Sequence, residues 1–250
     1  MDIRVLGSGP PDPFLSAADL FETEFSLDLP VRVQVRDDPD ERTWAGHYPD
    51  HHVLNISRQA ATSAMARELA LHELAHMARH EESHPSHTQP TEEALFLALA
   101  GRSVERHRLA HCYQIANHMK DIYADDLTLS VAPAEKLVLF FESQLAAALS
   151  DRPVEPRPDS RRISPGSDPE ITAVNAAFAL ALCERHDLLD DEHRLYDLAH
   201  AAADDAPAIE FGIFKSHFAS LVEDPTESDY RKALVDVTRE YCIREQQAAD

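Results

Sequence analysis

The chain of 250 residues has few of the residues that mark several common classes of protein. It has only three cysteines, and the odd number and wide spacing of Cys112, Cys183 and Cys242 exclude a disulfide framework and a zinc knuckle. No apolar stretch approaches the ~18 residues of a membrane span, and the N-terminus lacks a signal-peptide pattern. We therefore expect buried free thiols in a cytoplasmic protein.

Basic residues are also scarce. The chain has 23 Lys and Arg residues, of which only four are lysine, against 45 Asp and Glu residues, which gives a formal charge of -22. Such a composition indicates a protein adapted to a cytoplasm of very high salt, where screening suppresses self-repulsion; the alternative is an ordinary acidic protein. Either way, nucleic acid and anionic membranes are poor partners.

Strand patterns are confined almost entirely to the region before residue 58. Residues 30–36 alternate valine with polar side chains, which predicts a half-buried strand. Further extended segments are expected at residues 43–48 and 52–57, separated by turns. The segment from Phe14 to Phe25 is ambiguous and is compatible with a short helix. Later in the chain, only residues 127–131 resemble a strand.

Helical patterns dominate the rest of the chain. Long Ala- and Leu-rich segments predict helices at 92–121 and 135–149. Five prolines and four arginines between residues 150 and 169 predict a linker, and the last 80 residues are expected to form three or four helices, at 171–186, 192–203, 208–222 and 228–245. The expected organisation is a catalytic domain at 1–149, a linker at 150–169 and a helical domain at 170–250.

The sequence His72-Glu73-Leu74-Ala75-His76 matches the motif H-E-x-x-H. It lies in a segment without glycine or proline, which predicts a helix that ends before Pro85. Histidines four residues apart share one helix face, so both imidazoles can reach a single Zn²⁺. Glu73 lies beside them, where it can act as general base for a metal-activated water in peptide hydrolysis.

A zinc site of this kind needs a third protein ligand. The metzincin pattern would place glycine and histidine where the chain has Arg79 and Glu82, so that pattern fails. Three more histidines follow the motif at His80, His84 and His87. On an ideal helix His80 lies about 12 Å along the axis from His72, so these residues cannot join one ion unless the helix breaks.

Glutamates at the start of the next helix are the third source of a ligand. Glu92 and Glu93 follow Thr91 and open an otherwise apolar segment. Carboxylates at this position also complement the helix dipole, with Thr91 as N-cap, which explains at least one of the pair. Periodicity does not decide between the two.

Strands followed by a helix with H-E-x-x-H and a second helix with a glutamate resemble the gluzincin group of zincin metallopeptidases, over residues 30–110. In that group the metal-binding glutamate commonly precedes a small residue, so the resemblance implies Glu93, which precedes Ala94, as third ligand. It also implies an α+β fold, with a small N-terminal sheet packed on the active-site helices and a mainly helical C-terminal region. The whole chain further resembles an uncharacterised family from halophilic archaea.

Other residues are candidates for completing such a site. The residues that could stabilise an oxyanion are His107, His111, His118, Tyr113 and Tyr123, and the spacing does not select one. The strand edge at residues 54–57 could pair with an extended substrate. We interpret His47, His51 and His52 as surface residues.

The sequence therefore predicts a cytoplasmic zinc metallopeptidase acting on a peptide or protein substrate. His72, His76 and Glu93 would bind Zn²⁺, and Glu73 would be the general base. One alternative is a non-hydrolytic metal-binding or regulatory protein that uses the histidines from 72 to 87. Another is a helical interaction protein in which the motif is accidental. The sequence gives neither the substrate specificity nor the oligomeric state.

Overall fold

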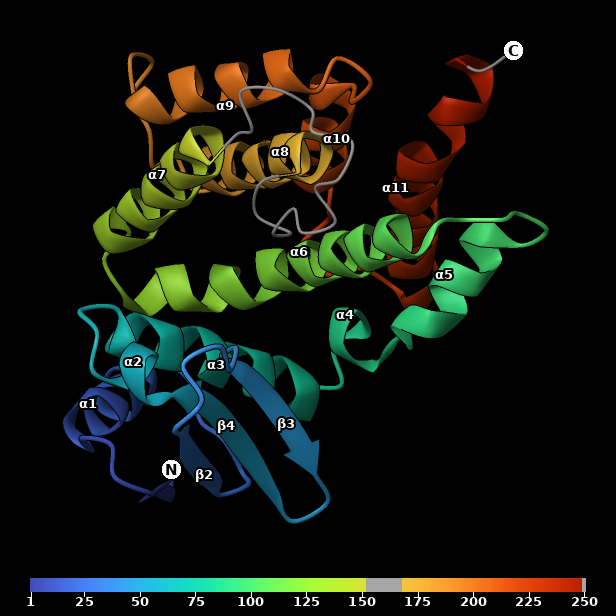
Figure 1. The fold of residues 1–250 in the computed structure, drawn as a ribbon. Coiled ribbons are helices and arrows are strands. Elements are labelled where there is room, and N and C mark those ends of the chain that lie inside the picture. Colours follow the sequence, from blue (N-terminus) through green and yellow to red (C-terminus); the bar gives the residue numbers. More distant parts are fainter. Residues whose placement is uncertain (152–167, 249–250) are drawn as a thin grey trace. The chain divides into compact units, whose positions relative to one another are not determined.

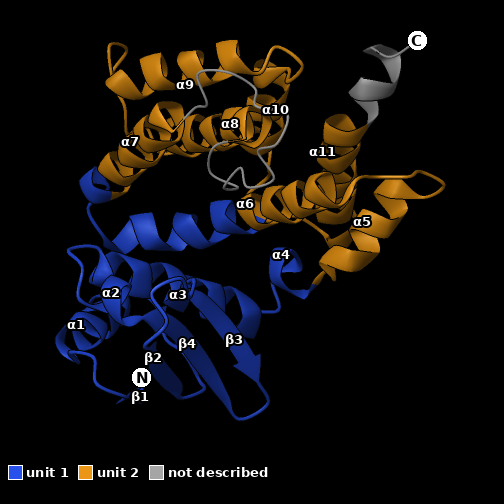
Figure 2. Cartoon of the chain, viewed as in Figure 1, with its two compact units in different colours: residues 1–88, 120–136 blue, residues 89–119, 137–250 orange. Residues whose placement is uncertain are grey.

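The computed structural model describes residues 1–151 and 168–248, with side chains through residue 242. These residues form two compact units: unit 1 comprises residues 1–88 and 120–136, and unit 2 comprises residues 89–119 and the rest of the chain from residue 137 (Figure 2). The expected boundaries at residues 149 and 170 thus differ from the observed ones. Most of the predicted linker, residues 152–167, lies outside the described residues.

Unit 1 contains a four-stranded sheet, which together with the many helices confirms the predicted α+β class (Figure 1). In spatial order the strands are β1 (Ile3–Leu6), β2 (Val31–Arg36), β4 (His51–Ser57) and β3 (Trp44–Tyr48). The first three are parallel, and β3 pairs antiparallel with β4. Three strands were predicted, whereas β1 was not. Because β4 is interior, the prediction that it offers a free edge is wrong: the edges are β1 and β3.

Two helices cover one face of this sheet. Valines at alternate positions of β2 point toward α1 (Asp12–Phe21) and α3 (Ala66–Glu81), which also pack on each other. The fully buried side chains of this core include Phe14, Phe21, Val33, Leu54, Ile56, Leu71 and Leu74. Burial of these side chains contributes roughly 1.5–3 kcal/mol each and holds α3 against the sheet. The motif helix is therefore held by the core of unit 1.

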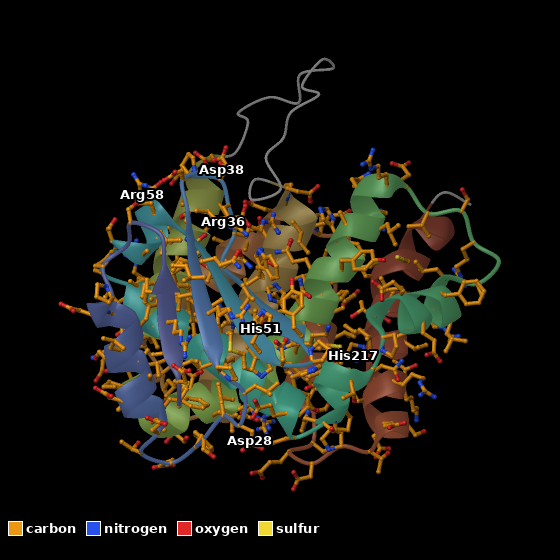
Figure 3. The ribbon with its side chains drawn as sticks, turned by 90° about the horizontal axis from the view of Figure 1, so that it is seen from below. Asp28, Arg36, Asp38, His51, Arg58 and His217 are labelled. Atoms are coloured by element: carbon orange, nitrogen blue, oxygen red, sulfur yellow. The ribbon has the colours of Figure 1, made fainter. Side chains whose placement is uncertain are left out.

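The opposite face of the sheet carries polar and aromatic side chains, and Figure 3 shows Arg36 and His51 on it. Arg36 donates a hydrogen bond to the Asn55 side chain at 3.1 Å. Trp44 and Tyr48 lie two residues either side of Gly46, and both are more than 40% exposed. A Cβ at position 46 would lie 2.8 Å from the Trp44 ring, so glycine allows the indole to lie flat along β3.

The helices after the motif differ from their expected bounds. The predicted helix at 92–121 is two helices, α5 (Thr91–Leu99) and α6 (Arg106–Val131), with Gly101 at φ +76° between them. The strand-like residues 127–131 lie at the end of α6, so that strand prediction is wrong. Leu127 and Thr128 are buried there, which shows tertiary packing overriding β propensity. The short helices α2 (Arg58–Ala61) and α4 (Pro85–Thr88) flank α3 in the chain.

Unit 2 is helical and contains the four predicted C-terminal helices. Besides α5 and the first part of α6, its helices are α7 (Glu135–Ser150), α8 (Pro169–Arg185), α9 (Arg194–Asp205), α10 (Phe211–Ala219) and α11 (Glu227–Ala248). Helix α7 belongs to this unit from residue 137 onward. Helix α8 is buried along most of its length between α9 and α10. Asp168 caps it by accepting hydrogen bonds from the backbone of Glu170 and Ile171. No helix of the described residues is long and apolar enough to span a membrane.

The three cysteines form no disulfide, as predicted, but two of them are close together. The Cys112 and Cys242 sulfurs lie 3.4 Å apart, and this contact, with burial, raises the pKa of the Cys112 thiol. Cys112 and Cys183 are fully buried, whereas Cys242 is half-buried.

We expect iodoacetamide to modify Cys242 first in the native protein, and Cys112 and Cys183 only in urea. Equal rates for Cys112 and Cys242 without urea, measured by mass spectrometry, would contradict this arrangement.

Candidate metal centre

Helix α3 presents the two motif histidines on its half-buried side, away from the sheet. Its buried residues Leu71, Leu74 and Ala75 face the core, which leaves His72 and His76 one turn apart on another side. The second part of α6, which belongs to unit 1, supplies Asp121 and Asp125, also one turn apart. Both carboxylates interact with the motif histidines.

Three potential ligand atoms converge at this point. The Nε2 atoms of His72 and His76 are 3.0 Å apart, and Asp121 Oδ1 is 3.7 Å from the first and 3.3 Å from the second. Ligands at the 2.0–2.1 Å bond lengths of tetrahedral zinc lie about 3.4 Å from one another. Two imidazoles and a carboxylate are also a donor set that zinc accepts. The residues present therefore fit the metal that the motif predicts.

The other nitrogen of each histidine has its own partner. His72 Nδ1 donates a hydrogen bond to the almost fully buried Asp125 carboxylate at 2.7 Å. His76 Nδ1 lies 2.7 Å from His87 Nε2. Burial lowers the pKa of His72, but Asp125 and Asp121 outweigh it and raise this pKa well above its usual value. Both imidazoles are thus held with Nε2 toward the convergence point, as metal-binding histidines usually are.

Glu73 is 6% exposed, between the motif histidines and the edge strand β3. Burial raises the pKa of its carboxyl, and the nearby His76 and His72 act in the opposite direction. A hydrogen bond from the Ala45 backbone also contacts the carboxylate. A buried carboxyl with a raised pKa beside a metal-binding group is the arrangement expected of a general base.

The chain reverses direction immediately after α3. Ser83 adopts a left-handed conformation with φ 55°, its N–H donates to the His80 carbonyl, and the His84 N–H donates to the Arg79 carbonyl. These two bonds define a Schellman motif. The helix therefore breaks within the histidine-rich segment from His72 to His87, which is what the later histidines need in order to approach the motif. The break brings His87 back to His76, whereas His80 remains one turn further along α3.

A second group of histidines lies where α3 passes β3 and β4. His52 is fully buried, with Nδ1 3.0 Å from His47 Nδ1 and Nε2 3.0 Å from Glu81 Oε1. The ring of His47 stacks on that of His80 at 4.0 Å. Burial first, and then His80 and His52, lower the pKa of His47 to about 3. The interpretation of His52 as a surface residue is wrong, because its register on β4 points it inward.

Glu81 links this histidine group to the start of β2. Its carboxylate accepts hydrogen bonds from the backbone N–H groups of Asp28 at 2.7 Å and Leu29 at 2.9 Å. Burial raises its pKa, but these bonds and His52 outweigh it, so the pKa of Glu81 lies below its ordinary 4.5. A lowered native pKa stabilises the fold above pH 4.5, and that contribution is lost as pH falls through the native pKa.

Glu81→Gln is therefore expected to lower the free energy of unfolding by about 1–2 kcal/mol at pH 7. The difference from wild type should shrink at pH values below 4.5, measured by urea denaturation across pH. Glu82→Gln is the matched control, because the Glu82 side chain is 47% exposed and forms a surface ion pair with Arg79 at 3.1 Å. Its effect should stay below about 1 kcal/mol. A difference for Glu81→Gln that is the same at pH 7 and pH 4 would contradict the assignment.

The remaining predicted residues lie elsewhere. Glu92 and Glu93 are exposed on α5 in unit 2, and Glu93 is not a member of the convergent group. His111 and His118 are also in unit 2, where they bond with the Tyr241 hydroxyl at 2.6 Å and the Asn175 side chain at 2.8 Å. His107 and Tyr113 are on the same part of α6. Of the oxyanion candidates, only Tyr123 belongs to unit 1; its buried ring packs 4.6 Å from that of His84.

Asp121 was missed by the sequence reasoning, which ended the helix at this residue. The signal that could have found it is the pair Asp121 and Asp125, four residues apart and therefore on one face of the helix. Two carboxylates on one face of a half-buried helix need positively charged or metal partners. His87 carried no such signal, because its position depends on the reversal at Ser83.

Unit 1 is thus an α+β unit in which the H-E-x-x-H helix and a second helix with paired aspartates form a candidate metal centre. The chain belongs to DUF5781, a family of unknown function whose model matches residues 1–243. A search of the curated proteins and a search of the solved structures each found no match.

Proposed function

We propose that this protein is a zinc-dependent metallopeptidase whose centre lies in unit 1. The observation that carries the proposal is the convergence of His72 Nε2, His76 Nε2 and Asp121 Oδ1 beside the buried Glu73. His72, His76 and Asp121 would hold zinc, with Asp121 in the place that the gluzincin resemblance gives to Glu93. When bound, zinc would acidify a water molecule and polarise a substrate carbonyl.

The protein's own residues would transfer the proton and hold the metal ligands in place. Glu73 would accept the proton from the attacking water and pass it to the leaving amine. Asp125 and His87 would hold the two imidazoles in the metal-binding orientation. The Ala45 backbone, by bonding to Glu73, would keep the carboxylate at the edge of the sheet.

A peptide substrate is supported by the position of β3. This strand is paired only with β4 among the described strands, so its other side is an edge, and helix α3 passes beside it. An extended peptide can add to such an edge through main-chain hydrogen bonds. The carbonyl groups of a bound chain would then pass close to Glu73.

The proposed setting is a cytoplasm of high ionic strength. The formal charge of -22 supports it, because salt screens the repulsion among the acidic groups. Assays of the protein should therefore be made in high salt.

The proposal is tested by metal analysis of the purified protein together with a broad peptide library. We expect about one zinc per chain, loss of that zinc in His76→Ala, and cleavage of at least some peptides by the wild type. Retention of zinc by His76→Ala would refute the centre. Zinc without cleavage of any peptide would instead favour a non-hydrolytic metal-binding protein.

A further inference from the structure

A row of hydrogen bonds extends from His76 into the chain reversal that follows α3. His76 Nδ1 is 2.7 Å from His87 Nε2, His87 Nδ1 is 2.7 Å from Ser86 Oγ, and Ser86 Oγ is 2.7 Å from His84 Nδ1. All four residues belong to unit 1. Neither the H-E-x-x-H motif nor the gluzincin resemblance assigns a role to the last three.

The end of the row that lies away from the motif is buried, and the whole row is held by backbone structure. Ser86 is fully buried and His84 is 8% exposed. The Schellman motif at Ser83 ends α3, and the short helix α4 then carries Ser86 and His87 back toward the motif. A side chain placed in this way has few alternative rotamers, so its hydrogen bonds are specific in direction.

Which atom donates in each hydrogen bond of the row follows from the state of His76. If His76 Nε2 is to bind a metal, its proton must be on Nδ1, which then donates to His87 Nε2. His87 Nδ1–H in turn donates to Ser86 Oγ, and the Ser86 hydroxyl donates to His84 Nδ1. The Ser86 backbone N–H also lies 3.2 Å from His84 Nδ1, which agrees with an acceptor there.

We propose that His87 is a positioning residue that sets the tautomer and ring orientation of His76 for metal binding. It does so as a neutral acceptor, whereas Asp125 does the same for His72 as a charged one. The site already contains the carboxylates of Glu73, Asp121 and Asp125, and a neutral imidazole fixes His76 without adding a fourth negative charge. The inference rests on the proposed zinc centre, but not on hydrolysis.

The test compares two substitutions of His87 by zinc affinity, measured by competition with a chromophoric chelator. Gln places an acceptor oxygen near the position of His87 Nε2, whereas Leu has none. We expect His87→Leu to weaken zinc binding by roughly 10–100-fold and His87→Gln to stay within a few-fold of wild type. The visible absorption of the Co²⁺-substituted protein should change in His87→Leu and be restored in His87→Gln.

The matched control is His51→Leu, a half-buried histidine of unit 1 that bonds to Asp50 at 2.7 Å rather than to the motif. It should leave zinc affinity and the cobalt spectrum unchanged. If His87→Leu does not fold, as judged by circular dichroism, Ser86→Ala replaces it. That change removes the acceptor of His87 Nδ1–H and should weaken zinc binding by several-fold.

Two results would overturn the inference while leaving the proposed function intact. One is a wild-type zinc affinity and cobalt spectrum in His87→Leu, or in Ser86→Ala where that variant is used. The other is equal loss in His87→Gln and His87→Leu, which would reduce His87 to a packing role. Absence of zinc binding by the wild-type protein would overturn the proposed function as well.

Discussion

Asp121→Asn is expected to weaken zinc binding by more than about 100-fold, because loss of a direct ligand should exceed the 10–100-fold cost of losing an outer partner. Asn retains the size of the side chain but loses the charge that faces His72 and His76 at 3.7 and 3.3 Å. Zinc affinity in high salt, measured by chelator competition, gives the result directly.

The same experiment decides between Asp121 and Glu93 as third ligand. Glu93→Gln should leave zinc affinity within a few-fold of wild type, and Glu92→Gln is its matched control on the same exposed turn of α5. The opposite pattern, with a large loss in Glu93→Gln and little in Asp121→Asn, would support the ligand implied by the gluzincin resemblance. It would also show that α5 binds the metal.

Glu73→Gln is expected to reduce peptide hydrolysis by roughly 10³-fold while zinc remains bound. The amide keeps the shape of the side chain but cannot accept the proton from water. Because burial raises the pKa of Glu73, the fold already disfavours its charge, and an uncharged substitute should not lower the melting temperature. Loss of activity together with an unchanged melting temperature and zinc content would therefore identify a chemical role.

Glu82→Gln provides the control for that prediction, since Glu82 is exposed and follows the end of α3. Its activity should equal that of the wild type. Hydrolysis by Glu73→Gln at more than about a tenth of the wild-type rate would argue against Glu73 as general base. The peptides used should be those that the wild type cleaves in the library screen.

The elements that could be predicted from the sequence are those with a strong local pattern. The alternating valines gave the position of β2, and the segment free of glycine and proline gave α3. Strand β1 was missed because its four residues include Arg4 and are too few to show a period. Residues 127–131 were misjudged because local propensity says nothing about the core against which α6 packs.

Only the residues of the candidate site that lie on helix α3 could be predicted from the sequence. His72, Glu73 and His76 are fixed relative to one another by helix geometry, so their spacing was informative. Asp121 lies 45 residues beyond His76, and only the packing of α6 on α3 brings its carboxylate within 3.3 Å of that imidazole. The position of His87 depends on a left-handed backbone conformation at Ser83, which a serine does not predict as a glycine would.

The exposed indole on β3 gives this protein an internal optical reporter. Trp44 is the only tryptophan of the chain, so all of its tryptophan fluorescence arises from this strand. Its neighbour Ala45 bonds to Glu73, which places the fluorophore one residue from the proposed reaction site. Docking of an unlabelled peptide along the edge would change the solvent around the indole, so binding can be titrated by emission even where no cleavage occurs.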